Sequence, residues 1–268
     1  MRRFLILMFT LLLMAETAPL CAQNLPVKDM ELRYDVWFGG IPVGELNWVI
    51  EKSPRSYSSQ VNLLTSGLMK SLTKFKGQAA ASGDWLKSNW PRTNNYLYQT
   101  TSRSRGQNYG WQLADDKKTA IVPGNKRYED RVPENLRSQV TDPLSALTLL
   151  RELALQNDFE KLRDLTIPVY DGRRRYDVAV ESVEEVDELM GKGKFPATRL
   201  RLKGAPLAGV DEKDFDRWKN HRLDIYFSRD DKRVPLQLVL ATDQFIFVLN
   251  FKDGCVQNQC GITLASLR

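Results

Sequence analysis

The chain has 268 residues, of which 42% are hydrophobic and 27% are charged, and its formal net charge is +6. This length can provide a large core, and β-rich chains of about 200 to 250 residues often form one domain. The single histidine excludes metal sites built from several histidines, and no Gly-x-Gly-x-x-Gly or Gly-Lys-Ser/Thr motif favours nucleotide chemistry. We therefore expect no cofactor, no metal and no nucleic-acid partner.

The first 22 residues have the three-part layout of a cleavable secretory signal peptide. Its parts are a positive start, an uninterrupted apolar run and a cleavage site: Arg2-Arg3, residues 4–14, and Leu20-Cys21-Ala22 before Gln23. The apolar run is shorter than the roughly 20 residues that cross a membrane, and no transmembrane segment is predicted elsewhere. The alternative is a lipoprotein acylated at Cys21, although Leu20 stands where that processing favours a small residue. We expect a periplasmic protein with one domain over residues 23–268.

A β-hairpin is predicted near the start of the mature chain. Apolar residues alternate along residues 31–38 and again along residues 43–50, as in strands with one buried face. Gly39-Gly40 lies between them and supplies the positive φ angles that tight hairpin turns need. A short helix is a weaker prediction for residues 66–73. Further strands are predicted at residues 57–65, 75–86, 92–101, 109–113 and 119–122.

The most clearly predicted helix spans Leu144 to Gln156. Asp142 is a favourable N-cap, and Pro143 suits the first helical position, where its missing N–H has no intrahelical partner. Leucines then recur at helical spacing, at positions 144, 147, 150 and 153. With its cap the helix covers about residues 143–156, and it is apolar enough to be buried.

The rest of the chain again reads as strands, which are predicted at residues 165–170, 174–183, 195–203, 221–227, 234–240 and 245–251. Antiparallel pairing of consecutive strands is the simplest topology. A sheet of more than about ten such strands tends to curl or split. We therefore predict a mainly β (α+β) fold, in which a single strongly curved antiparallel sheet or incomplete β-barrel is covered or plugged by the one apolar helix.

Removal of the signal peptide leaves two cysteines, Cys255 and Cys260. An even number of cysteines in an oxidising compartment predicts a disulfide. A redox-active pair is more often spaced Cys-x-x-Cys, and a zinc site would need two more ligands. We expect a structural disulfide that closes a small loop near the C-terminus.

The residues that carry catalysis in other proteins form no recognisable set in this sequence. A Ser-His-Asp or Cys-His arrangement would need His221, which lies at the start of a predicted strand, and no Gly-x-Ser-x-Gly elbow is present. An acidic run offers paired carboxylates, but neighbours along one strand or turn usually form a solvated face. This run comprises Glu181, Glu184, Glu185, Asp187 and Glu188. We expect a protein that is not an enzyme, and we name no catalytic residue.

Basic residues are arranged more suggestively. Arg199, Arg201 and Lys203 share one face of a predicted strand, and Arg173 and Arg175 repeat the pattern one strand earlier. If the two strands pair, five cations form a patch that is suited to phosphate or carboxylate headgroups. The alternative is that these cations pair with the acidic run on an outer face.

The sequence is also rich in aromatic residues, including six tryptophans: Trp37, Trp48, Trp85, Trp90, Trp111 and Trp218. Most of them are expected to fill the core. In a half-open barrel, however, inward-facing aromatic and leucine side chains can line a cavity for an acyl chain. The sequence alone does not distinguish a packed interior from a hollow one.

Several segments together resemble the domain-of-unknown-function family 3108 (DUF3108) of bacterial exported proteins. They are Tyr34-Asp-Val-Trp-Phe-Gly-Gly-Ile-Pro-Val-Gly44, Asp142-Pro-Leu-Ser-Ala-Leu147, Asp171-Gly-Arg-Arg-Arg-Tyr-Asp177, Gly193-Lys-Phe-Pro-Ala-Thr-Arg-Leu200 and Asp231-Lys-Arg-Val-Pro-Leu236. The resemblance implies no activity. The architecture expected for the family is similar to the curved, helix-plugged sheets of periplasmic lipoprotein carriers and envelope-integrity proteins. This similarity is an analogy at the level of the fold.

These observations lead to three hypotheses. The first is a non-enzymatic periplasmic protein that binds a lipid, another amphipathic envelope ligand or an anionic envelope polymer, or that maintains the envelope. The second is a scaffold that binds another envelope protein through an exposed strand edge or the cysteine loop. The third is a carboxylate-dependent hydrolase of cell-wall glycan.

Overall fold

The computed structural model describes residues 27–121, 131–157, 159–190 and 193–267. The predicted signal peptide and its cleavage site after Ala22 lie outside the described residues, as do Val122 and the Gly191-Lys192 part of a predicted turn. Among the described residues, no helix has the length and apolar character needed to cross a membrane.

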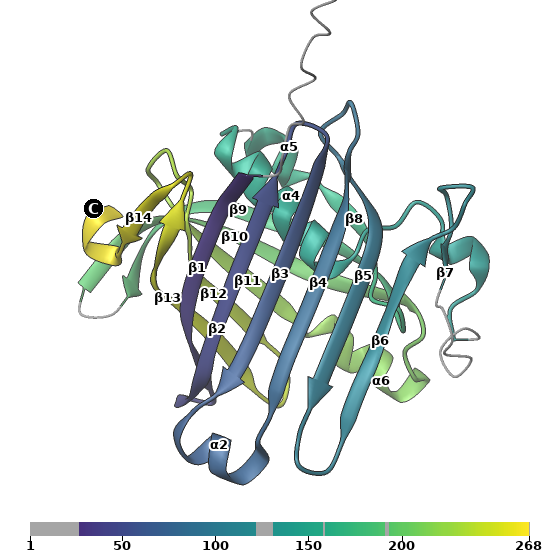
Figure 1. Ribbon diagram of the computed structural model, residues 1–268, viewed down its shortest axis with the longest axis horizontal. Coiled ribbons are helices and arrows are strands. Elements are labelled where there is room, and N and C mark those ends of the chain that lie inside the picture. The colour runs from purple at the N-terminus through teal and green to yellow at the C-terminus, as the bar shows by residue number, and fades with distance from the viewer. Residues whose placement is uncertain (1–26, 122–130, 158, 191–192, 268) are drawn as a thin grey trace, which may run out of the picture.

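The described residues form one open antiparallel sheet of 14 strands (Figure 1). The first seven strands are β1 (Val27–Phe38), β2 (Ile41–Lys52), β3 (Ser56–Thr65), β4 (Lys76–Trp85), β5 (Pro91–Thr101), β6 (Gly106–Leu113) and β7 (Ala120–Ile121). The other seven are β8 (Thr166–Tyr170), β9 (Arg175–Met190), β10 (Gly193–Ala208), β11 (Arg222–Ser228), β12 (Pro235–Ala241), β13 (Ile246–Val256) and β14 (Gln259–Ile262). The spatial order is β7-β6-β5-β4-β3-β2-β1-β13-β12-β11-β10-β9-β8, with β14 paired to β13. Each half is therefore a meander, and β1 and β13 join the halves.

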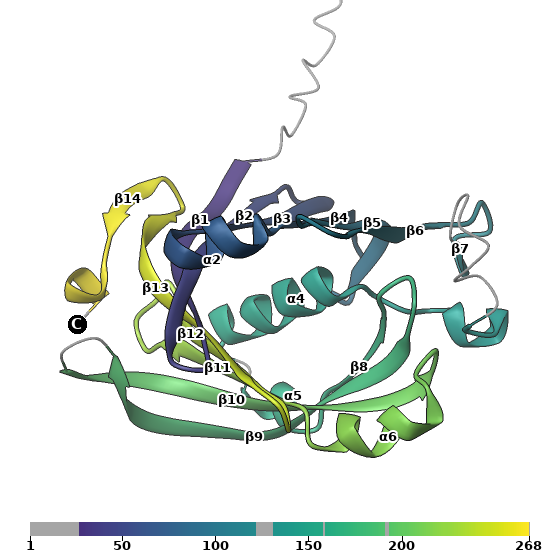
Figure 2. The ribbon, with the colours of Figure 1, turned by 90° about the horizontal axis from the view of Figure 1, so that it is seen from below.

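The sheet folds over one long helix, α4 (Pro143–Leu155), which lies between the half containing β1–β6 and the half containing β8–β13 (Figure 2). The predicted mainly β fold with one enclosed apolar helix is confirmed. Shorter helices are α2 (Gly67–Thr73), α5 (Phe159–Arg163) and α6 (Glu212–Lys219), with 3-10 turns at Glu134–Arg137 and Leu264–Leu267.

The hydrophobic core surrounds α4. Leu149 and Leu150 of the helix are buried in one cluster with Leu32 and Tyr34 of β1 and with Phe227 of β11. Strand alternation explains this arrangement, since every second residue of β1 from Met30 to Val36 is buried. The helix is thus the central element against which both halves of the sheet bury their apolar faces.

The two edges of the sheet approach each other without pairing as strands. Trp111 of β6 donates an indole N–H hydrogen bond of 2.8 Å to the carbonyl oxygen of Tyr170 at the end of β8. Gly172 adopts a φ of +86° beside β6, and a Cβ there would lie only 3.2 Å from backbone atoms of Gly110. Thr141, just before α4, forms an isolated parallel bridge to Val169. The chain leading into α4 therefore fills the gap between the edges.

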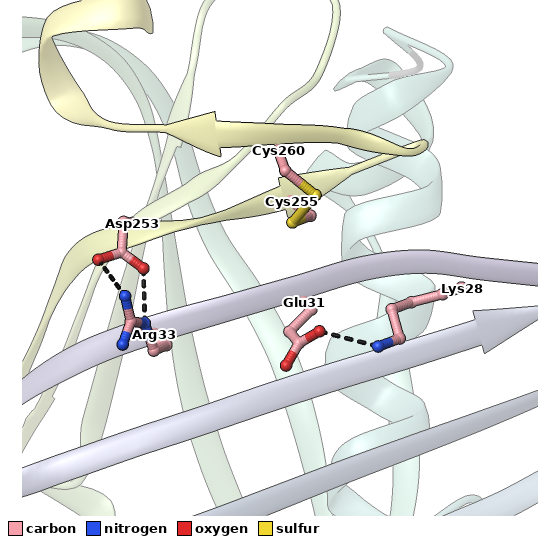
Figure 3. The surroundings of a disulfide bond; sticks show 6 residues. All are labelled: Lys28, Glu31, Arg33, Asp253, Cys255 and Cys260. Atoms are coloured by element: carbon pink, nitrogen blue, oxygen red, sulfur yellow. Dashed lines mark hydrogen bonds and ion pairs between the residues drawn. A yellow bond between two sulfur atoms is a disulfide. The ribbon is translucent and has the colours of Figure 1, made fainter.

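A cross-strand disulfide joins Cys255 of β13 to Cys260 of β14, as predicted, with Cα atoms 4.0 Å apart (Figure 3). On the other side of β13, Asp253 receives two hydrogen bonds of 2.6 and 2.7 Å from the Arg33 guanidinium of β1. The disulfide thus fastens the terminal hairpin to a strand that is already tied to the main sheet.

Replacing both cysteines, Cys255→Ser and Cys260→Ser, is expected to lower the free energy of unfolding by about 2 kcal/mol, because the cross-link restricts a small loop of the unfolded chain. Urea unfolding of the double variant measures this loss. Wild-type protein kept in reductant serves as the control and should show the same stability as the double variant. A loss below about 0.5 kcal/mol would contradict a stabilising role for the cross-link.

The predicted strands are all present, but several boundaries and elements differ. Strands β9 and β10 are longer than predicted, because the acidic run from Glu181 to Glu188 continues β9 and its residues from Ser182 onward pair with β10. Helix α6 and strand β14 were not predicted. The sequence of α6, Glu-Lys-Asp-Phe-Asp-Arg-Trp-Lys, is dominated by charged residues and lacks the apolar periodicity of a buried helix.

Candidate functional site

A cavity of about 400 Å³ lies between α4 and the inner face of the sheet half that contains β8–β12. Helix α4 contributes Pro143, Ala146, Leu147 and Leu150 to its wall, and these positions fall on one side of a helix. The opposite wall comes from apolar side chains such as Val178 of β9, Leu202 of β10 and Leu223 of β11. Its volume lies within the range of about 300 to 1,000 Å³ that is usual for small-molecule sites.

Small residues explain why this part of the interior is hollow. Ala146 is the smallest of the four cavity-lining residues of α4, and it lies between the larger Pro143 and Leu150 positions. Across the cavity, Gly204 continues the inward face of β10 after the buried Leu200 and Leu202, but it has no side chain. A Cβ at Gly204 would lie 3.7 Å from the Trp218 ring, so this aromatic side chain covers the glycine.

Trp218 of α6 lines one end of the cavity, which we call its mouth. Its ring centroid lies 5.1 Å from that of Tyr176 on β9 and 5.2 Å from that of His221. The Arg174 guanidinium lies 5.5 Å from the centroid of Trp218, within the range of a cation–π interaction. Helix α6 and the turn before β9 thereby bring an aromatic residue and a cation to one side of the opening.

A second, more polar pocket of about 290 Å³ adjoins the mouth. Its cations are Arg131, Arg173, Arg174 and Arg217, and its acidic residues are Asp211 and Asp243. We call it the basic pocket. Arg174, Trp218, His221, Thr242 and Phe245 line both the basic pocket and the cavity, so the two spaces are adjacent.

The turn between β8 and β9 positions two of the arginines. The carboxylate of Asp171 accepts backbone N–H hydrogen bonds from Arg173 at 2.8 Å and Arg174 at 2.7 Å, and Gly172 supplies the positive φ. The Arg173 guanidinium lies 5.1 Å from the centroid of the Tyr109 ring. Both arginine side chains are therefore presented by a turn whose backbone is fixed.

The one histidine of the chain lies at this mouth, directly after α6. Burial lowers the pKa of His221 below its ordinary value of 6.5, the nearby charge of Arg174 lowers it further, and Asp243 opposes the shift. The imidazole is therefore neutral at neutral pH. In that state it provides one hydrogen-bond donor and one acceptor at the opening of the cavity.

Residues 33–245 of the chain match a family described as "Protein of unknown function (DUF3108)". The chain belongs to this DUF3108 family. No curated protein matches the sequence. The structure is similar to the crystal structure of a "Beta-barrel-like Protein of Domain of Unknown Function DUF1849" from Brucella abortus, with a TM-score of 0.51 and 11% sequence identity. The match covers 86% of this chain and 97% of the other, and at this identity it shows the fold alone.

In this DUF3108 chain, the predicted pairing of the two basic strands is present, but the five predicted cations do not form one patch. Arg199 on β10 lies opposite Glu184 on β9, whereas Arg175 lies opposite Ala208, beyond Lys203. The structure therefore separates Arg173 and Arg175 from the three cations of β10.

Carboxylates lie close to the cations on both strands. Arg199 pairs with Glu184, Arg201 lies 3.0 Å from Asp224, Lys203 lies 3.5 Å from Glu181, and Arg175 lies 2.7 Å from Asp177. Pairing with the acidic run, the alternative interpretation of the sequence, accounts for Arg199 and Lys203. Of the five predicted residues, Lys203 lines the cavity and Arg173 lines the basic pocket.

Sequence reasoning did not assign Arg174, Arg217 or Trp218 to a site. Trp218 and Arg217 lie on α6, a helix that the apolar pattern did not predict. A weak signal was present, because Phe215 and Trp218 are three residues apart and Asp211 precedes them at the N-cap position. Arg174 was predicted only as the start of a strand and as part of a family motif. Its neighbours Arg173 and Arg175 were assigned to the basic strand face instead.

Proposed function

We propose that this DUF3108 protein is a non-enzymatic binding protein of the cell envelope, and that the cavity beside α4 holds the apolar part of an amphipathic ligand. The observation that carries the proposal is the cavity of about 400 Å³, lined mainly by apolar side chains and open at a mouth with Arg174 and His221. Such a lining favours burial of a hydrocarbon chain, which is stabilised by about 25 cal/mol per Å² of apolar surface removed from water.

The periplasm is the compartment we propose. The signal-peptide pattern of residues 1–22 supports export, and the Cys255–Cys260 disulfide is of the kind that persists in oxidising compartments. In that compartment, lipids and other envelope amphiphiles are the available ligands with a hydrocarbon chain.

A series of saturated fatty acids of increasing length tests the proposal. We expect affinity to rise by about fourfold for each added methylene, which corresponds to about 0.8 kcal/mol, until the chain fills the cavity. Longer chains should then show no further gain. Titration calorimetry with purified protein measures the dissociation constants. Absence of binding across the series would overturn the proposal.

A matched pair of variants tests whether the hydrocarbon chain of the ligand binds in this cavity. Leu147 lines the cavity and is half-buried, so Leu147→Trp adds volume there without a fully buried site having to accept it. Leu155 is also half-buried on α4 but does not line the cavity, so Leu155→Trp is the control. We expect Leu147→Trp to weaken binding of the longest chains by about tenfold or more, and Leu155→Trp to leave it within twofold. Equal effects would show that the chain binds elsewhere.

A further inference from the structure

We propose that the basic pocket binds the anionic head of the ligand whose chain occupies the cavity, so that the preferred ligand is a single-chain amphiphile ending in a phosphate or a carboxylate. This inference rests on the proposed function, because it assigns the second half of the same ligand. It names a binding site that differs from the basic strand face predicted from the sequence.

The shared lining of the two spaces is the first support. Five residues belong to both linings, and three of them, Arg174, Trp218 and His221, surround the opening from the turn after β8 and from the end of α6. In the proposed pose, a linear molecule lies with its chain against Leu147 and Leu150 and with its polar end in the basic pocket. A ligand without a chain would leave the apolar cavity unfilled, and an anionic head would meet the positive charge of the basic pocket.

Charge and donor geometry are the second support. The basic pocket contains four arginines, against Asp211 and Asp243. All four cations are arginines rather than lysines, and the planar guanidinium can donate two parallel hydrogen bonds to a phosphate or carboxylate. Neutral His221 adds an uncharged hydrogen-bonding group among the residues that line both the pocket and the cavity.

Arg174 is the central residue of this assignment. It lines both spaces, its backbone is fixed by the hydrogen bond to Asp171, and its guanidinium lies beside Trp218. Within the described ranges of the chain, its guanidinium has no ion pair with a carboxylate, in contrast to Arg199 and Arg201 on β10. Its charge lies at the junction of cavity and pocket, and it also acts on the buried carboxyl of Asp171, whose pKa burial raises and the charge of Arg174 lowers.

The experiment compares three probes with the same twelve-carbon chain: dodecyl phosphate, dodecanoic acid and the neutral 1-dodecanoylglycerol. Wild-type protein should bind at least one of the anionic probes about tenfold more tightly than the neutral probe, as expected for hydrogen bonds to a charged group. The order of the two anionic probes distinguishes a phosphate head from a carboxylate head. Calorimetry at two salt concentrations should show a salt-dependent affinity for the anionic probes alone.

Variants then locate the head. Arg174→Gln should weaken the preferred anionic probe by about tenfold and leave the neutral probe within twofold, whereas Arg174→Lys keeps the charge but not the paired donors and should retain only part of the preference. Arg163→Gln removes the same charge from an exposed position on α5 that lines neither space, and it should change nothing.

The outcomes separate the two proposals. If none of the three probes binds, the proposed function fails and this inference fails with it. If the neutral probe binds as tightly as both anionic probes, the cavity assignment stands and the head assignment is overturned. If Arg174→Gln weakens all three probes equally, the anionic preference does not depend on Arg174, which then only supports Trp218, and the head assignment is again overturned.

Discussion

Replacing Asp29 by alanine is expected to lower the free energy of unfolding by about 3 kcal/mol or more, because it removes the closest carboxylate of a buried arginine. Arg151 of α4 has a fully buried side chain, and its Nη1 atom lies 2.6 Å from Oδ2 of Asp29 on β1. The other carboxylate near Arg151 belongs to Glu152, at 3.5 Å, and Glu152 also pairs with Lys52 of β2. The loss of Asp29 therefore leaves a buried charge that is only partly compensated.

Urea unfolding measures the effect, and a neighbouring ion pair provides the control. Glu31 lies on the same strand and pairs with Lys28 at 2.9 Å, but both side chains are partly exposed to solvent (Figure 3). Glu31→Ala should change stability by less than about 1 kcal/mol, since exposed pairs contribute little. If Asp29→Ala and Glu31→Ala have equal effects, the buried pair does not hold α4 against β1.

A double variant tests the reason for the loss. Asp29→Asn combined with Arg151→Met removes both charges and fills the space of the arginine with an apolar side chain. In other proteins, such a replacement of a buried ion pair is often neutral or stabilising. We expect the double variant to be more stable than Asp29→Asn alone. A double variant that is less stable than the single one would show that Arg151 has a role other than its pairing with Asp29.

The elements that were predicted from the sequence are those whose signals are local. The first hairpin follows from alternating apolar residues and from Gly39-Gly40, which have φ angles of +55° and +83°. Helix α4 follows from Asp142, Pro143 and the spacing of its leucines. In both cases, neighbouring residues determine the conformation.

The candidate site depends instead on contacts between distant parts of the chain. Ala146 and Gly204 leave the cavity open only because α4 faces β10, and neither residue is unusual in its own segment. Trp218 belongs to a helix without an apolar stripe, and its position depends on Gly204 and Tyr176. No pattern within a window of ten to twenty residues contains this information.

The basic strand face also shows that the sequence predicts local periodicity but not the contacts between strands. The alternation of Arg199, Arg201 and Lys203 was correctly read as one face of a strand, because this periodicity is local. Their carboxylate neighbours come from β9 and β11, and which residue faces which depends on the strand register. The sequence therefore identified the cations but left open whether their charge is available to a ligand.

Replacing Asp142 by alanine is expected to cost about 3 kcal/mol, because this residue both caps α4 and organises a buried polar network. The carboxylate is fully buried and accepts backbone N–H hydrogen bonds from Leu144 at 2.8 Å and Ser145 at 3.1 Å. It also accepts a hydrogen bond of 2.7 Å from the hydroxyl of Thr93 on β5. Loss of a cap typically costs about 1 kcal/mol, and each buried donor left without a partner costs about 1 to 3 kcal/mol more.

The control for the cap is the corresponding residue of α6. Asp211 occupies the N-cap position there, but its exposed side chain makes no capping hydrogen bond. Asp211→Ala should therefore change stability by less than about 0.5 kcal/mol in the same thermal or urea unfolding experiment. A loss from Asp142→Ala no larger than that from Asp211→Ala would show that the buried network does not stabilise α4.

Asparagine at the same position separates the oxygen acceptor from the negative charge. Burial raises the pKa of the Asp142 carboxyl above its ordinary value of 3.8, against the opposing effect of its hydrogen bonds, so the folded protein binds this proton more tightly than the unfolded chain does. The stability that protonation provides is fully present below about pH 3.8 and is lost as the pH rises through the raised pKa.

Asp142→Asn keeps an acceptor for the helix N–H groups and cannot ionise. The difference in stability between wild type and Asp142→Asn should therefore shift in favour of the variant as the pH rises from about 3.8 to neutrality. A difference that stays constant over this range, or that shifts in favour of the wild type, would mean that the folded protein does not raise this pKa.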